Sequence, residues 1–378
     1  MPKIAFVGEA WGAWEAKAKR PLVGISGLEL FNQLTESGIV TQTSDDRSNI
    51  RDFWHFWRIW RDNDRSDNLI QTKPMERIWD AHPEIFLTNV FNFQPKGNNI
   101  ETLCVPKKES MSSLPPIKAG KYLAPCLEPE LAKLQKTLFS LRPNLIVALG
   151  GTAAWALLRD PRITKLRGAI AACLPPFEGK VLPIYHPAHV IRPDAYKNRH
   201  VTIIDLFKAK REMEYPDIRR PARTVLIPES IDDLYTIRAM ASDRGLSPDI
   251  ETAGDQITCV GFGFDEKLAV CIPFVDPRRM GASYWGTPAE EKLAWEVVKE
   301  LSGRECRKIF QNALFDVNRL WRSYGITFGG DIEDTMLMHH ALQPESPKDL
   351  GFLGSVYTNE PAWKLMRARG RDNFKKEE

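Results

Sequence analysis

The sequence has no close pair of cysteines, because its six cysteines stand far apart, at positions 104, 126, 173, 259, 271 and 306. This spacing excludes a disulfide-stapled scaffold and a self-contained zinc site, and it favours a reducing cytoplasm. Long hydrophobic runs are also missing, since the longest apolar stretch covers residues 145–158 and is interrupted by Gly150 and Gly151. Such a stretch is too short to span a bilayer, and no signal peptide precedes the first expected strand, so we expect no membrane association.

The chain has no strong excess of charge of one sign. Its 52 Lys and Arg against 49 Asp and Glu give a formal net charge of +3. Any surface that binds nucleic acid must therefore be local. A hydrophobic content of 43% beside 27% charged residues is typical of a globular protein, and 378 residues are more than one ordinary domain holds.

Strands and helices alternate in the first half of the chain. Residues 3–8, 84–93, 144–150 and 180–187 are expected strands, while residues 26–37 and 130–143 have helical character. This alternation predicts a mainly parallel sheet, in which functional side chains gather at the carboxyl ends of the strands. The residues at those ends are Glu9, Asn89, Gly150 and His186.

Two prolines and alternating charges at 214–223 predict a linker between domains at 1–213 and 224–378. Beyond it we expect a helix at 231–244 and a three-stranded meander between 246 and 275. The second domain is therefore an α/β unit with a mixed sheet.

Two segments of the first domain allow more than one interpretation. The glycines around Glu9 fit either a tight strand-to-helix turn or a ligand that approaches the backbone closely. The segment RDFWHFWRIWRD, residues 51–62, could stack on bases and hold phosphates. It could equally be an amphipathic helix that buries its tryptophans.

Four ordered segments resemble the motifs of the family-4 and related uracil-DNA glycosylases. They are GEAWGAWEAKAKRPLVGISG (8–27), LTNVFNFQPKGN (87–98), the stretch from Cys126 to Ala154, and LPIYHPAHVIR (182–192). The resemblance covers most of residues 3–200, and four segments in order are more specific than any single motif.

The resemblance implies a role for each residue that matches a motif. Asn89 would read the edge of a uracil flipped out of the DNA, and His186 would donate a hydrogen bond to the departing base. Glu9 would hold or activate the attacking water. The other residues assigned to substrate binding are Gly8, Gly12, Glu15, Leu22 and Arg192.

The sequence also departs from this family at several positions. Leu22 replaces the phenylalanine that stacks on uracil, and Trp11 replaces a proline. Of the four cysteines that hold the family's iron–sulfur cluster, only Cys126 is matched, and Phe93 stands at another of those positions. One cysteine cannot hold a cluster, so we expect none. The fold is expected to be kept, while uracil excision stays open.

Acidic residues of the second domain resemble the first two motifs of DEDD-type 3'-5' exonucleases. Asp249 and Glu251 share one face of a strand, and Asp316 follows Asn312 by one helical turn. Carboxylates that converge in this way can hold two Mg²⁺ or Mn²⁺ ions. By the same resemblance Asn312 binds substrate and Asp334 is an auxiliary metal-binding acid, but the third motif is missing.

The order of the two domains resembles the N-terminal part of phage-type family-A DNA polymerases. We therefore expect a three-layer glycosylase-like parallel-sheet domain followed by a ribonuclease H-like exonuclease domain, incomplete at its C-terminus. The expected partners are DNA, as a single strand or primer terminus, and a downstream polymerase module or chain. The expected location is the cytoplasm, which is that of the host cell if the protein is phage-encoded. The alternative is a non-catalytic, uracil-sensing DNA-binding module of a split or truncated polymerase.

Overall fold

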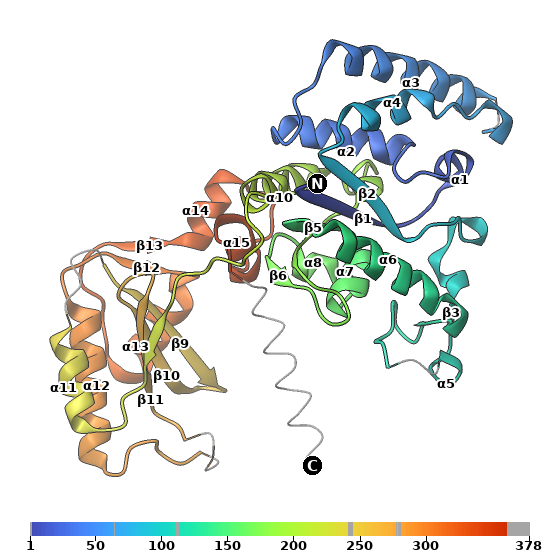
Figure 1. Cartoon of the computed structure of the whole chain (residues 1–378). Coiled ribbons are helices and arrows are strands. Elements are labelled where there is room, and N and C mark those ends of the chain that lie inside the picture. Colours follow the sequence, from blue (N-terminus) through green and yellow to red (C-terminus); the bar gives the residue numbers. More distant parts are fainter. Residues whose placement is uncertain are drawn as a thin grey trace. The chain divides into compact units, whose positions relative to one another are not determined.

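The computed structural model describes residues 2–63, 65–110, 113–240, 245–276, 278 and 281–360 (Figure 1). The chain forms two compact units. Unit 1 runs to Arg219 and resumes at Gly354, and unit 2 comprises Arg220–Leu353. The first boundary falls inside the segment predicted as a linker. The return to unit 1 at Gly354 differs from the sequence-based division, which placed this stretch in the second domain.

Unit 1 is built on a five-stranded sheet of order β2-β1-β5-β7-β6. β1 (Ile4–Ala10), β2 (Ile85–Phe91), β5 (Leu145–Leu149) and β7 (Lys180–Ile184) run parallel, and the short β6 (Ala171–Ala172) is antiparallel to β7. The central strands are mostly apolar, as expected of a sheet covered on both faces, and the exceptions are Glu9 near the end of β1 and Lys180 at the start of β7. The predicted α/β class and parallel sheet are confirmed.

Successive side chains of β1 enter two different cores. Ile4 and Phe6 pack with α2 (Ile25–Glu36), α3 (Ser44–Asp62), α4 (Lys73–Ala81) and α10 (Arg199–Glu212). Ala5 and Val7 pack with α6 (Glu128–Leu141) and α7 (Gly151–Leu158) on the other face. Because side chains of a strand alternate between faces, these two cores define the three layers of the unit. The remaining elements of this unit are α1 (Ala13–Ala18), β3 (Cys104–Val105), α5 (Lys107–Ser110), β4 (Tyr122–Leu123), α8 (Ile163–Leu166) and α9 (Pro187–Val190).

Helix α3 contains the tryptophan-rich segment. A capping box between Thr43 and Asp46 begins the helix. Phe53 is fully buried, and Trp57 and Trp60 pack partly buried against the core. The structure therefore favours the amphipathic helix over a row of exposed aromatic rings, although Trp54 remains 37% exposed.

Unit 2 contains a four-stranded mixed sheet of order β8-β11-β10-β9. β9 (Ser247–Ala253), β10 (Gln256–Gly263) and β11 (Leu268–Pro273) form the predicted antiparallel meander, and β8 (Thr224–Leu226) runs parallel to β11. The other elements are α11 (Ile231–Ala239), α12 (Pro288–Gly303), β12 (Lys308–Phe310), α13 (Ala313–Tyr324), β13 (Ile332–Asp334), α14 (Thr335–Leu342) and α15 (Leu350–Tyr357), which continues into unit 1.

Across the described part of the chain, none of the helices combines the length and the apolar character that crossing a bilayer would need.

Candidate functional site

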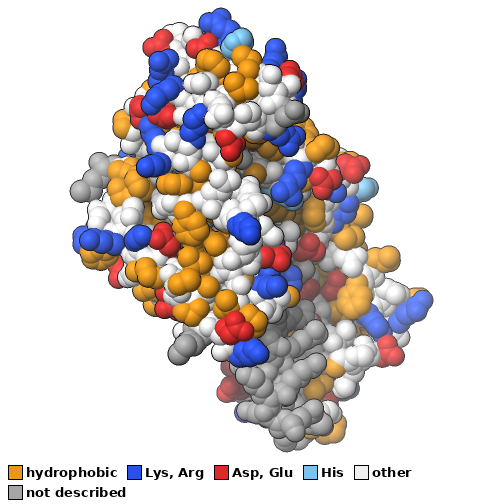
Figure 2. All heavy atoms as spheres, turned by 90° about the vertical axis from the view of Figure 1, so that its right-hand side faces the viewer, with side chains coloured by type: hydrophobic (Ala, Val, Ile, Leu, Met, Phe, Trp, Pro, Cys, Tyr) orange, Lys and Arg blue, Asp and Glu red, His pale blue; other side chains and the backbone are white. Residues whose placement is uncertain are grey.

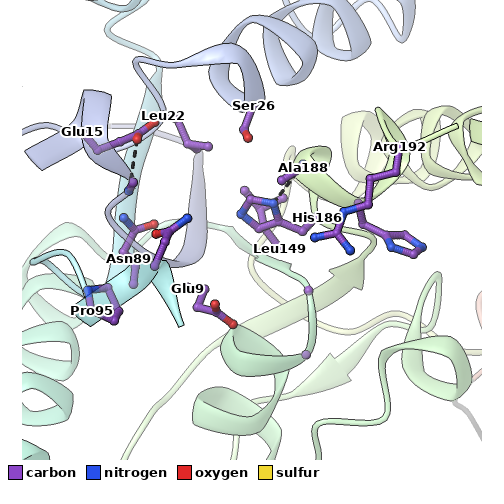
Figure 3. Close-up of a pocket in the computed structure, with 16 residues that line it drawn as sticks. Glu9, Glu15, Leu22, Ser26, Asn89, Pro95, Leu149, His186, Ala188 and Arg192 are labelled. Atoms are coloured by element: carbon purple, nitrogen blue, oxygen red, sulfur yellow. Dashed lines mark hydrogen bonds between the residues drawn. The ribbon is translucent and has the colours of Figure 1, made fainter. Parts of the chain in front are cut away.

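A cavity of about 320 Å³ opens at the carboxyl ends of the parallel strands of unit 1 (Figure 3). Glu9 from β1, Asn89 from β2 and His186 after β7 all line it, as the strand order predicts. The other lining residues are Ala10, Gly12, Glu15, Leu22, Ser26, Pro95, Asn98, Leu149, Gly150, Gly151, Ala188, His189 and Arg192. Among these, Ser26, Pro95, Asn98 and His189 lie inside the segments that match the motifs, but the sequence analysis assigned no role to them.

The pairing of β2 with β1 fixes the position of Asn89 in the lining of this cavity. Asn89 pairs directly with Gly8 of β1, and only 3% of its surface is exposed. A Cβ atom added at Gly8 would lie 2.2 Å from Asn89 Oδ1 and 3.7 Å from His186 Nε2. Gly8 therefore serves the site by leaving room for the two polar side chains above it.

The imidazole of His186 is fixed in one tautomer. Its Nδ1 accepts a hydrogen bond of 3.0 Å from the backbone N–H of Ala188, at the start of α9. Desolvation, with the nearby charges of Arg192 and His189, lowers the pKa of His186 to about 4. The ring is therefore neutral near pH 7, and its Nε2 carries the proton as a hydrogen-bond donor.

The Glu9 carboxylate is oriented by a residue that sequence reasoning did not assign. Its Oε2 accepts a hydrogen bond from the Thr152 hydroxyl. Thr152 is 5% exposed and lies in the first turn of α7, where the helix dipole favours a negative charge. The only sequence signal for Thr152 is its place in the matched segment that ends at Ala154.

Glu15 joins two backbone segments instead of leaving its carboxylate open. Its oxygens accept hydrogen bonds of 3.1 Å from the backbone N–H groups of Gly12 and Gly24. Burial raises the pKa of Glu15, although these bonds oppose the shift. Glu15, predicted to bind substrate, thus ties together the two glycine segments that form one wall of the cavity.

Leu22 lies at the wall of the cavity in the left-handed backbone region, with φ of 54°. Its carbonyl accepts a hydrogen bond of 2.7 Å from Trp79 Nε1 of α4. A Cβ atom added at Gly27 would lie 1.7 Å from the same carbonyl oxygen. Such a backbone conformation persists only where neighbours impose it. Arg192, exposed at the cavity, adds a positive charge beside it.

In unit 2, three of the predicted acids influence one another. Asp249 is exposed on β9, while Asp316 of α13 is buried and accepts a hydrogen bond of 3.0 Å from the backbone N–H of Ile250. Burial raises the pKa of Asp316 to about 7, and the charges of Asp249 and Asp334 contribute to that shift. Glu251 lies beside Cys259 on the neighbouring strand.

The predicted metal ligands do not assemble into a metal centre. Among the described residues, no group of three or more His, Cys, Asp or Glu side chains is arranged to hold a metal ion. Asp334 is occupied by the backbone N–H groups of Asn312, Ala313 and Met336, at distances of 2.8–3.1 Å. Asn312 contacts Asp334 through its backbone N–H and not through its side-chain amide. The expected Mg²⁺ or Mn²⁺ pair therefore does not fit these acids as they stand, and no metal-dependent step follows from them.

Solved structures of the EXD2 exonuclease domain resemble part of the chain. The domain soaked in Mg and dGMP has a TM-score of 0.24 and 14% identity, covering 37% of this chain and 72% of that one. The domain soaked in Mn and Mg has a TM-score of 0.23 and 16% identity, covering 36% and 70%. TM-scores this low support no conclusion about unit 2.

Sequence comparison assigns unit 1. A type-4 uracil-DNA glycosylase of Thermotoga maritima is 26% identical over 210 residues, which are 55% of this chain and 76% of that protein. The model of the uracil DNA glycosylase superfamily matches residues 1–205. Together with a polar cavity at the carboxyl ends of the strands, this match shows that the chain belongs to the uracil DNA glycosylase superfamily.

Proposed function

We propose that unit 1 hydrolyses the bond between uracil and deoxyribose in DNA. The observation that carries this proposal is the convergence of Glu9, Asn89 and a neutral, donor-ready His186 on one cavity. These are an acceptor carboxylate, an amide able to read a base edge, and a hydrogen-bond donor. A base flipped out of the helix would enter the cavity from the ends of the strands.

The departing base needs a hydrogen-bond donor rather than a strong acid. Negative charge develops on its oxygen as the bond from C1′ to nitrogen breaks and the electron pair moves onto the base. His186 Nε2–H donates to that oxygen, and the low pKa of the ring keeps this donor neutral. The Asn89 amide hydrogen-bonds the edge of the same base and holds it in place.

Water completes the reaction. The Glu9 carboxylate, held by Thr152, orients one water so that its oxygen forms the new bond to C1′. The proton released from that water passes to the carboxylate, as in general-base catalysis. The uracil anion takes up a proton from solvent and the Glu9 carboxyl returns its proton to solvent, so the products are free uracil and an abasic deoxyribose.

Leu22 is expected to weaken the binding of uracil in the cavity. An aliphatic side chain packs on a ring without the stacking that an aromatic residue supplies, which is worth about 1–3 kcal/mol per base. A pocket with Leu22 in this place would therefore hold uracil less tightly. Uracil sensing without excision is accordingly the second candidate for unit 1.

A uracil-containing oligonucleotide labelled at one end separates these candidates. After incubation with the protein, alkali breaks the strand only where the base has been removed. Breaks that disappear with His186→Asn and Asn89→Ala support excision. Intact DNA with retained binding supports sensing.

We propose for unit 2 a nuclease-type role, the 3'-5' exonuclease activity expected from its sequence motifs. It is supported by the shared electrostatic environment of Asp249, Asp316 and Asp334. Because these acids do not form a metal site as they stand, the proposal requires them to move closer together when DNA and the divalent ions bind. Incubation of labelled single-stranded DNA with Mg²⁺ or Mn²⁺ tests it: stepwise shortening that Asp249→Ala abolishes supports a nuclease, and intact DNA supports a scaffold. Association with a separate polymerase module belongs to the same proposal, and co-purification with such a module would test it.

A further inference from the structure

The outer face of α3 carries a row of exposed cations, here termed the α3 arginine stripe. It consists of four arginines, Arg47, Arg51, Arg58 and Arg61, with Trp54 between them, and all five side chains are exposed. Their spacing of four and three residues places them on one side of the helix, over about 21 Å at 1.5 Å per residue. In Figure 2, blue Lys and Arg side chains lie beside orange hydrophobic and red Asp and Glu ones at the top of the molecule, where Figure 1 places α3.

Only part of this positive charge is paired directly with an acid among the described residues, although Asp62 lies close enough to attract both Arg61 and Arg58. Among the described residues, Arg47, Arg51 and Arg58 form no ion pair, and Arg61 pairs with the exposed Asp62 through a bond of 2.7 Å. Like charges in a row repel one another, so the stripe complements an anionic partner. Helix α3 also contains Asp45, Asp46, Asp52 and Asp62, so it has no net charge as a whole. The positive excess belongs to the face that carries the stripe.

The apolar side of α3 is already used by the fold. Phe53 is buried, and its ring lies 5.3 Å from that of Trp14, while the Trp60 ring lies 5.6 Å from Trp14. A helix that binds a lipid surface must insert its apolar side, and α3 cannot do so without leaving the core. The stripe is therefore an electrostatic surface and not a membrane anchor.

The stripe also lies on an element that supports the cavity. Trp14 belongs to α1, and the next residue, Glu15, holds the wall of the cavity through Gly12 and Gly24. Helix α3 packs on that wall from outside. The stripe and the cavity therefore belong to the same unit, and α1 contacts both the helix that carries the stripe and the wall of the cavity.

We propose that the α3 arginine stripe binds single-stranded DNA. The guanidinium groups contact successive phosphates, and the exposed face of Trp54 stacks on a base. The base faces of a duplex are covered by their neighbours, so Trp54 selects the single strand. This binding is independent of base excision, because the stripe lies outside the cavity.

Fluorescence anisotropy with a labelled oligonucleotide of thymidine alone tests the proposal, because this probe contains no uracil. The triple variant Arg47→Ser, Arg51→Ser, Arg58→Ser should bind about ten-fold more weakly or worse at low salt. Its plot of log affinity against log salt concentration should be shallower by about 2, since each lost phosphate contact removes about 0.7. Trp54→Ala should weaken binding about ten-fold, and Trp54→Phe should keep most of the affinity.

A matched control removes the same charge from other exposed helical surfaces of unit 1, by Lys133→Ser, Lys136→Ser and Arg211→Ser. Equal loss in this control, or unchanged binding by the stripe variants, would overturn the proposal. So would a duplex that binds as tightly as the single strand and does not respond to Trp54→Ala. Uracil release, followed in parallel, should show a raised KM and an unaltered kcat in the stripe variants, and no release by the wild type would refute the proposed excision without bearing on the stripe.

Discussion

The imidazole of His186 accepts the Ala188 N–H at Nδ1, and its pKa is lowered to about 4. We predict that its ring protons titrate near pH 4 in NMR spectra, below the value of about 6.5 for an unperturbed histidine. The reason is that protonation would put a charge into a desolvated place and remove the acceptor of the Ala188 bond. A titration near pH 6.5 would contradict this assignment of His186.

The lowered pKa of His186 also makes the stability of the folded protein depend on pH. Between about pH 6.5 and pH 4 the unfolded chain binds a proton at this residue and the folded chain does not. The free energy of unfolding therefore falls as the pH drops through that window, by up to about 3 kcal/mol from this group. Urea denaturation at pH 7 and pH 4 should show a smaller loss for His186→Asn than for the wild type.

Gly8 is a position where one methyl group should disable the cavity. In Gly8→Ala the new Cβ would overlap Asn89 Oδ1, so the amide must move. A displacement of about 1 Å costs on the order of a hundred-fold in rate, and we expect that loss in uracil release. The control Gly303→Ala, where an added Cβ meets nothing within 4 Å, should leave the rate unchanged.

Thr152 is expected to act only through Glu9. Thr152→Val keeps the shape of the side chain and removes the donor, whereas Thr152→Ser keeps the hydroxyl. A hydrogen bond to a charged group is worth about 1.5–3 kcal/mol, so kcat for uracil release should fall roughly ten- to hundred-fold in the valine variant. Recovery by serine, with KM unchanged, would separate positioning of Glu9 from a loss of fold.

At this scale the sequence predicted the residues that belong to motifs and missed the residues that orient them. Glu9, Asn89 and His186 are assigned by matched motifs, and the parallel sheet brings all three to one edge. Thr152 meets Glu9 across 143 positions of the chain, a contact that no local pattern contains. Glu15 is an acidic residue at a motif position, but only the structure shows that its carboxylate accepts hydrogen bonds from backbone N–H groups.

At the scale of elements, β7 and α10 are joined by a buried ion pair. Lys180 is almost completely buried. Its Nζ donates a hydrogen bond of 2.9 Å to Glu212 Oε2 and further hydrogen bonds to the carbonyl oxygens of Glu212, Tyr215 and Asp217. This one amine closes the end of α10 and holds the first residues of the predicted linker to unit 1.

Lys180→Met should therefore destabilise unit 1 strongly. It leaves the Glu212 carboxylate buried without its partner, a change that costs about 3–5 kcal/mol. Urea denaturation followed by tryptophan fluorescence measures the loss. Lys133→Met, on the exposed face of α6, should change stability by less than about 0.5 kcal/mol. Equal midpoints for the two variants would refute this role of Lys180.

Most elements were predictable because their hydrophobic period is strong. The apolar strands β1 and β5 and the meander of β9, β10 and β11 lie where the sequence predicts them. Helix α11 covers Ile231–Ala239 of the predicted helix, and the predicted positions 241–244 lie outside the described residues. The tryptophans of α3 were ambiguous because aromatic rings at helical spacing serve equally well in a core and on a binding face. Only packing against Trp14 decides between them.

For the whole molecule, the sequence predicted two α/β modules in the right order. It did not predict that the chain comes back to unit 1. Lys208 donates hydrogen bonds to the carbonyl oxygens of Gly168, Ser355 and Thr358, and Arg167 donates one to the Ser355 hydroxyl. These contacts hold the end of α15 in unit 1. They depend on buried charges that are distant in sequence, so no linear pattern indicates them.

Uracil release by the whole chain tests the proposed function of the cavity most directly. The measurement is alkali-induced breakage of a single-stranded oligonucleotide with one uracil, after incubation with wild type, His186→Asn or Asn89→Ala. For the wild type we predict breakage at the uracil alone. For each variant we predict a rate that is lower by at least about a hundred-fold, since each removes a contact to the departing base. Binding of that oligonucleotide by the wild type without breakage, or equal breakage by all three proteins, would contradict the assignment of this cavity to base excision.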